Sequence, residues 1–360
     1  MDQQTVRSTN TERSSLSSPP SNRVEWIDIA KGVGIVLVSF GHLRNGDGQS
    51  VWLPALDGLI SAIYLFHMPL FYLLGGLTFS MRGGFRSFLL RKVRTLLVPY
   101  YVFSLYFLAK PFAILFIPSM RTAFQTTHNY DIAHQFYDVL IAGNGLWFLM
   151  AFFVAEIIMY GIMSITRGNI FALSATGCLF ITFSYVRTEL LQDFVLPFQL
   201  LQGVGIAGFM CIGFVLKSQL KHMRRSAALI AGGIGFIALS AVSVYVITQS
   251  IPSSVLWLAG ICAATIGAFA VIFLCIAMRS CDILSAIGRN SLVYYALNAL
   301  TLNIVKFSVF RVLHINMTTW PLVFQMGGGD CAHNYCAGLV IRRKSFRPKI
   351  YAMDSKSVLI

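Results

Sequence analysis

The chain has 360 residues, of which 56% are hydrophobic and only 12% are charged. Soluble domains are about 25% charged, so this composition excludes an ordinary soluble enzyme and is typical of a protein that crosses a membrane many times. The formal net charge of +14 does not indicate a nucleic-acid partner, because basic residues of membrane proteins gather in cytoplasmic loops. The seven cysteines include no CxxC pair, so we expect no metal site.

The first 22 residues are rich in Ser, Thr, Asn, Gln and Pro, and they lack the apolar core of a signal peptide. We expect them to form a disordered cytoplasmic tail. The sequence predicts that a transmembrane domain follows over residues 23–313, as an all-α, polytopic helix bundle embedded in membrane lipid. A spanning helix needs about 17–25 apolar residues. Nine segments qualify, at residues 27–43, 60–80, 95–117, 145–165, 170–186, 196–216, 227–248, 254–277 and 290–312.

The distribution of basic residues predicts the orientation of this bundle. With a cytoplasmic N-terminus, the inner loops hold twelve Arg and Lys residues and the outer loops hold four. This excess on the inner side follows the positive-inside rule. We therefore expect an integral multi-pass protein of the plasma (inner) membrane, with its N-terminus in the cytoplasm.

The tail over residues 314–360 departs from the pattern. After nine spans it would lie outside, yet it is strongly basic and has no apolar run long enough to cross a membrane. Our hypothesis is that a tenth helix has been lost through a frameshift or a truncation.

A polar stripe marks the first predicted span, "DIAKGVGIVLVSFGH". Lys31 and His42 are eleven positions apart, so at about 100° per residue they share one helix face, separated by about 16 Å along the axis. Asp28, three residues before Lys31, lies on the same face. Polar stripes in membrane helices face a bundle interior or a wet cavity. This placement favours His42 as a general base. The alternatives are that Asp28 and Lys31 anchor the helix at the membrane interface and that His42 packs between helices.

Three further side chains in apolar runs are candidates. His67 lies in the middle of the second span and Glu156 in the middle of the fourth, and ionisable groups at such depth are functional candidates. Trp147, at the start of the fourth span, is a candidate for substrate binding. The alternatives are helix packing for His67, a protonated and hydrogen-bonded acid for Glu156, and the interfacial aromatic belt for Trp147.

Basic residues are concentrated in "RGGFRSFLLRKVRTLLVPYY", after the second span. Arg91 and Arg94 are i, i+3 neighbours on a helix. A pair of guanidinium groups at the inner surface suits a phosphorylated ligand. Lipid headgroup binding and a purely topological role are the alternatives.

Five segments together resemble one family: "IDIAKGVGIVLVSFGH", "FHMPLFYLLGGLTF", "RKVRTLLVPYY", "LWFL" and "GRNSLVYYALN". In this order they are similar to the integral-membrane acyltransferase-3 superfamily, and most similar to its fucose 4-O-acetylase-related branch. The resemblance implies a bundle of about ten helices that moves an acyl group, usually acetyl from cytoplasmic acetyl-CoA, to hydroxyls of glycans. It also implies catalytic roles for Lys31 and His42 and a role for Arg91 and Arg94 in handling acyl-CoA.

The chain departs from the family in two motifs. Gly75 stands where the second-span motif usually has Ser, and Asn298 stands near the place of a frequent His. We expect a membrane O-acetyltransferase that acts on a surface glycan, a glycan precursor or a glycolipid, directly or through a covalent histidine intermediate. A transporter or flippase of such a precursor is the main alternative, and an inactive remnant is a third.

Overall fold

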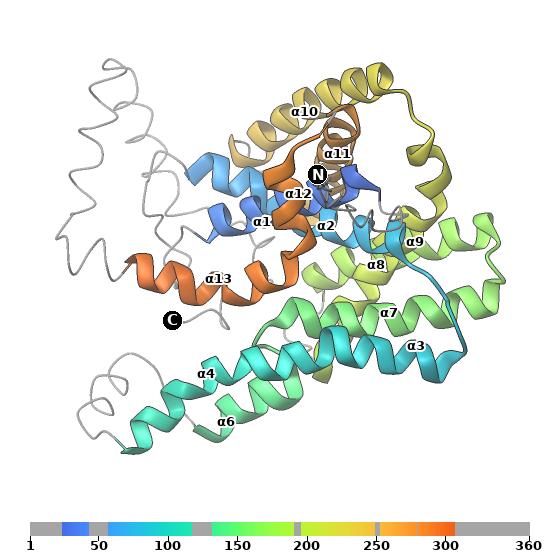
Figure 1. Ribbon diagram of the computed structural model, residues 1–360. Coiled ribbons are helices and arrows are strands. Elements are labelled where there is room, and N and C mark those ends of the chain that lie inside the picture. Colours follow the sequence, from blue (N-terminus) through green and yellow to red (C-terminus); the bar gives the residue numbers. More distant parts are fainter. Residues whose placement is uncertain are drawn as a thin grey trace, which may run out of the picture.

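The computed structural model describes residues 24–42, 57–116, 132–190, 196–248, 253–278 and 280–306, and every regular element within these ranges is a helix (Figure 1). The tails predicted at residues 1–22 and 314–360, with the proposed lost helix, lie outside them. The elements are α1 (Glu25–Gly41), α2 (Asp57–Thr78), α3 (Phe85–Lys92), η2 (Val93–Leu97), α4 (Val98–Phe116), α6 (Ile132–Tyr137), η3 (Asp138–Ala142), α7 (Trp147–Thr166), α8 (Ile170–Leu190), η4 (Pro197–Gln199), α9 (Leu200–Lys221), α10 (Arg225–Thr248), α11 (Ser253–Ala277), α12 (Asp282–Arg289) and α13 (Ser291–Lys306).

The all-α prediction is confirmed, and the described part of each of the nine predicted spans falls mainly on a helix. Six segments of the described chain are long and apolar enough to cross a membrane: Gly58–Thr78, Ala133–Thr166, Ile170–Arg187, Pro197–Lys221, Arg225–Val246 and Val255–Ala277. The protein is therefore an integral membrane protein built as a helical bundle. The short α12 and the α6–η3 segment were not predicted, because neither is apolar for long enough to stand out in the hydropathy pattern.

Helix α2 forms the centre of the bundle. It packs on α9, α11 and α1, and Leu70, Leu73 and Leu74 on it are almost completely buried. A helix that is apolar all round is suited to such a position, because every one of its faces meets another helix.

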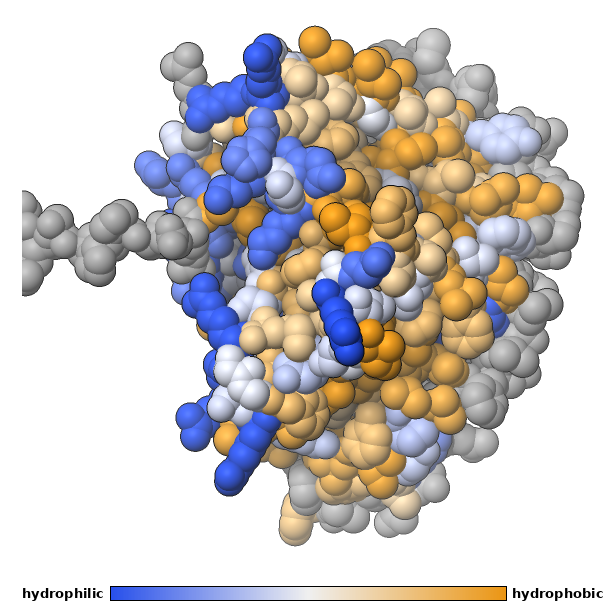
Figure 2. Space-filling model, turned by 90° about the vertical axis from the view of Figure 1, so that its right-hand side faces the viewer, coloured by the Kyte–Doolittle hydropathy of each residue, from blue (hydrophilic) through white to orange (hydrophobic). Residues whose placement is uncertain are grey.

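The outer helices present apolar side chains outward. On α10, Ile234 and Ile237 remain 63% and 71% exposed, and α10 lies at the opposite edge of the bundle from α4 and α6 (Figure 1). Figure 2 shows hydrophilic residues gathered along one edge of the molecule and hydrophobic residues over most of the rest of that face. This division fits a lipid-facing belt bounded by a polar membrane surface.

Two glycines let α2 and α9 approach backbone to backbone. A Cβ at Gly76 would overlap the carbonyl oxygen of Met210, and a Cβ at Gly213 would overlap that of Leu73. Small residues at such contacts allow close van der Waals packing, which drives helix association in lipid.

We predict that Gly76→Ala lowers the free energy of unfolding by about 1–3 kcal/mol, because the added methyl group forces α2 and α9 apart. Thermal unfolding of the detergent-solubilised protein measures the effect. Gly161→Ala is the matched control, since a Cβ there meets nothing within 4 Å. Equal melting temperatures for the two variants would contradict the close contact of α2 and α9.

Candidate active site

Helix α1 packs against α12, α13 and α2, and the start of its polar stripe lies at α12. Asp28 is buried, while Lys31 and His42 are partly buried. A Cβ at Gly32 would overlap the Leu284 carbonyl oxygen, and a Cβ at Gly288 would overlap that of Asp28. The backbone of α12 therefore rests directly on the turn of α1 that carries the start of the stripe.

A second histidine lies beside the end of this stripe. His42 follows the last residue of α1, and its Nδ1 lies 2.8 Å from the Val38 carbonyl oxygen. His67 makes the same contact on α2, at 2.9 Å from the Ile63 carbonyl. A carbonyl oxygen only accepts hydrogen bonds, so in both rings Nδ1 carries the proton and Nε2 carries the lone pair when the imidazole is neutral.

Tyr64 contacts both His67 and the last residue of α1, which precedes His42. Its hydroxyl donates to the Gly41 carbonyl at 3.2 Å, and its ring meets His67 edge-on with 5.0 Å between the centroids. His42 and His67 are also close enough to interact electrostatically. The structure therefore brings together two histidines that are 25 positions apart in the sequence.

A groove opens between α1 and α13 near this end of the stripe. The Ser39 hydroxyl donates to Asn298 Oδ1 at 2.8 Å. Around this pair lies an open cavity of ≈ 430 Å³. It is lined by Ser39, Asn290, Val293, Tyr294, Leu297, Asn298 and Thr301.

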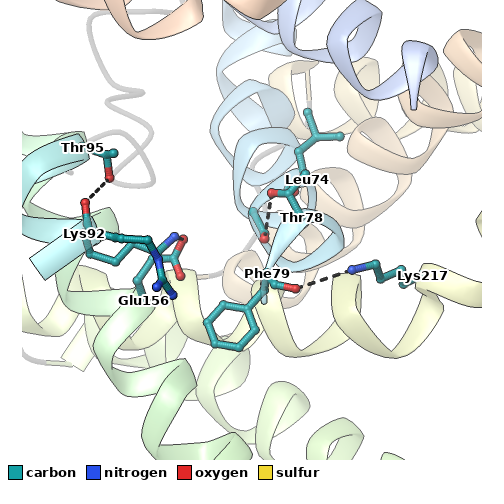
Figure 3. Close-up of polar contacts among 9 residues, drawn as sticks. Leu74, Thr78, Phe79, Lys92, Thr95, Glu156 and Lys217 are labelled. Carbon is teal, nitrogen blue, oxygen red and sulfur yellow. Dashed lines mark hydrogen bonds and ion pairs between the residues drawn. The ribbon is translucent and has the colours of Figure 1, made fainter. Parts of the chain in front are cut away.

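A separate cluster lies where the helix that runs from α3 through η2 into α4 packs on α7. Lys92 Nζ donates to Glu156 Oε1 at 2.5 Å, and the two side chains face each other in Figure 3. Arg91 and Arg94 are exposed, and Arg91 donates to the Arg82 carbonyl. Arg94 lies in the π-helical turn η2, and such turns occur often at functional sites.

Aromatic rings between these helices converge on Phe148 of α7. Phe71 and Tyr72 of α2 contact it, with centroids 5.8 and 6.2 Å away. Tyr295 of α13 contacts it at 5.4 Å. Trp147 meets the same ring edge-on at 6.3 Å and packs against the main core, so it is partly buried in the bundle.

A family profile described as an acyltransferase domain matches residues 24–328. The chain belongs to the acyltransferase-3 family. The nodulation protein NolL of Sinorhizobium fredii is 42% identical over 71 residues, which is 18% of this chain and 18% of that protein. The match thus spans less than a fifth of this relative's length. No solved structure matches the chain.

The motifs that carry the family resemblance meet in this acyltransferase. The first and last motifs touch at Gly32 and Gly288, and three of them supply the rings around Phe148. Gly75 stands where the family motif usually has Ser, and in this structure a Cβ at that position would overlap the Phe152 ring. Asn298, near the place of the frequent histidine, pairs with Ser39.

The predicted site residues of the acyltransferase therefore fall into two groups. Asp28, Lys31, His42 and His67 lie on α1, directly after it and on α2. The residues on α3, η2 and α7 are Arg91, Arg94, Trp147 and Glu156. Glu156 is brought to Lys92, a residue that sequence reasoning did not single out. The signal for Lys92 was present in the "RKVR" segment, but nothing in the sequence links it to a residue 64 positions away.

We predict that Phe148→Ala destabilises the acyltransferase by about 3–5 kcal/mol, because it leaves a cavity where three helices meet. Phe171→Ala is the control, since this ring is 86% exposed on α8. Unfolding curves of both variants test this, and a small effect at position 148 would show that the aromatic cluster can collapse without cost.

Proposed function

We propose that this acyltransferase moves an acetyl group from cytoplasmic acetyl-CoA to a hydroxyl group of a surface glycan, a glycan precursor or a glycolipid. The observation that carries the proposal is the arrangement of His42, Tyr64 and His67 at the end of the α1 stripe. It places two imidazoles with lone pairs on Nε2 in a helical bundle, where few other groups can accept a proton.

The basic cluster suits the donor. Arg91 and Arg94 are exposed, and guanidinium groups bind phosphates through paired hydrogen bonds. The pantetheine arm would then extend between the helices toward Lys31, which Asp28 would orient. The rise of about 16 Å from Lys31 to His42 covers half of a hydrocarbon core about 30 Å thick.

In the proposed reaction His42 Nε2 takes the proton of the acceptor hydroxyl while the hydroxyl oxygen attacks the thioester carbonyl carbon. The tetrahedral intermediate collapses by breaking the carbon–sulfur bond. The thiolate of coenzyme A leaves and takes the proton from His42. An O–H and a C–S bond are thus exchanged for an ester C–O and an S–H bond, and neither metal nor redox partner is required for this balance.

The groove between α1 and α13 suits the acceptor. Its hydroxyl and amide groups, on Ser39, Asn298 and Thr301, are of the kind that bind sugar hydroxyls. His67 and Trp147 are proposed to contribute to acceptor binding from α2 and α7.

We predict that His42→Ala reduces acetyl transfer by about 10²–10⁴-fold, because the general base is lost. Incorporation of radiolabelled acetyl from acetyl-CoA into membrane and glycan fractions measures it. His222→Ala is the matched control, since His222 is an exposed histidine at the end of α9. Equal transfer by parent and His42→Ala at equal membrane levels would remove His42 from the chemistry.

The polar stripe and the groove of α1 also favour a second candidate, transport of a glycan or lipid precursor.

We predict that Arg91→Ala and Arg94→Ala raise the KM for acetyl-CoA about tenfold each if the proposed transfer is right, because each removes a charge-assisted hydrogen bond. A transporter would tolerate both substitutions, and it would neither transfer nor hydrolyse acetyl-CoA.

A further inference from the structure

Lys92 differs from its two arginine neighbours in the direction of its side chain. Arg91 and Arg94 are exposed, whereas the Lys92 side chain is 24% exposed and reaches Glu156, whose side chain is 4% exposed. The Lys92 ammonium also lies 5.5 Å from the centroid of the Phe88 ring. It is therefore held at the boundary between the bundle and the surface that carries both arginines.

Stability does not explain this ion pair. Glu156 Oε2 is buried and has no hydrogen-bond partner among the residues that the structure describes. A buried acceptor left without a partner destabilises the fold, and buried ion pairs can often be replaced by apolar residues without loss. A pair built only to join α3 to α7 would be expected to satisfy both carboxylate oxygens.

The surroundings of Lys92 favour an anionic ligand. Residues 82–94 hold five basic side chains and no acidic one, so Glu156 neutralises only one charge of the cluster. A free lysine side chain has many rotamers, and it loses part of that freedom when it binds a ligand. A fixed carboxylate removes that cost in advance, as the buried glutamate of protein kinases does for their phosphate-binding lysine.

We propose that Lys92 is a third cation of a phosphate site formed with Arg91 and Arg94, and that Glu156 is the positioning residue that holds Lys92 there. The ligand class is a soluble polyphosphate, and its identity as the coenzyme A part of the acyl donor rests on the proposed function. Glu156 thus acts through Lys92 and does not touch the reacting atoms.

The test measures binding of coenzyme A and of inorganic diphosphate to the purified full chain in phosphatidylcholine nanodiscs. We expect Lys92→Met to weaken both about tenfold or more, as for the loss of a hydrogen bond to a charged group, and to raise the KM for acetyl-CoA with little change in kcat. Glu156→Gln should weaken both by several-fold. Lys217→Met is the matched control, because this lysine likewise has one oxygen contact, to the Phe79 carbonyl at 3.5 Å (Figure 3), and one ring contact, to Phe214.

Exchanging the two charges distinguishes a role of Glu156 in positioning Lys92 for a ligand from a role in joining α3 to α7. The double variant Lys92→Glu/Glu156→Lys keeps an ion pair between α3 and α7. We therefore expect it to be thermally more stable than the single variants, but not to recover binding of coenzyme A or diphosphate. Recovery of both, or parental affinity in Lys92→Met, would overturn the proposal. The proposal would also be overturned if the parent protein bound phosphatidylglycerol in the nanodisc but bound neither coenzyme A nor diphosphate.

The two proposals fail in different ways. A parent protein that binds diphosphate through Lys92 but transfers no acetyl group would contradict the proposed function and leave the anion site intact. A parent that transfers acetyl groups, with an unchanged KM in Lys92→Met, would contradict the anion site alone.

Discussion

The contact of α12 with α1 at Gly32 and Gly288 is the constraint on which the rest of the site depends. Neither position leaves room for a Cβ, so the two backbones fix each other's place. Because α13 follows α12 after a single residue, this contact also decides where α13 begins. Asn298 then reaches Ser39, and Tyr295 reaches Phe148. Helix packing in lipid depends on such close approach, since lipid tails supply no hydrophobic force between helices.

The bundle keeps its two polar clusters on different helices. The histidines lie where α1 meets α2, and the basic cluster lies where α3 and η2 meet α7. The aromatic rings that contact Phe148 connect α2, α7 and α13. An arrangement of this kind can hold a charged ligand at one place and a proton acceptor at another, near the open groove between α1 and α13.

Periodicity and hydropathy were enough to predict much of the structure. The described parts of the nine apolar segments are mainly helical, because backbone groups in lipid must be satisfied within the helix itself. The α1 stripe was predictable because Asp28, Lys31 and His42 belong to one helix, whose geometry fixes their relative directions. The same reasoning selected Glu156 and His67 as ionisable groups in apolar runs.

The contacts between helices could not be predicted from the sequence. The Lys92–Glu156 pair and the contacts of Tyr64 with Gly41 and His67 depend on which helices become neighbours. Nothing in the local sequence encodes that choice. The short α12 escaped prediction for a related reason. Its role comes from the fit of Gly288 against α1 and not from its own hydropathy.

The π-helical turn η2 affects how the long helix from Phe85 to Phe116 tolerates changes in length. A π turn closes its hydrogen bonds one residue later than an α turn, so it holds one residue more than a regular helix needs. Deleting a residue within Val93–Leu97 would remove that extra residue and leave Lys92 and Tyr100 close to their present faces. The same deletion within α4 would rotate all later side chains by about 100°. A single deletion in this helix is therefore tolerated best at the turn that carries Arg94.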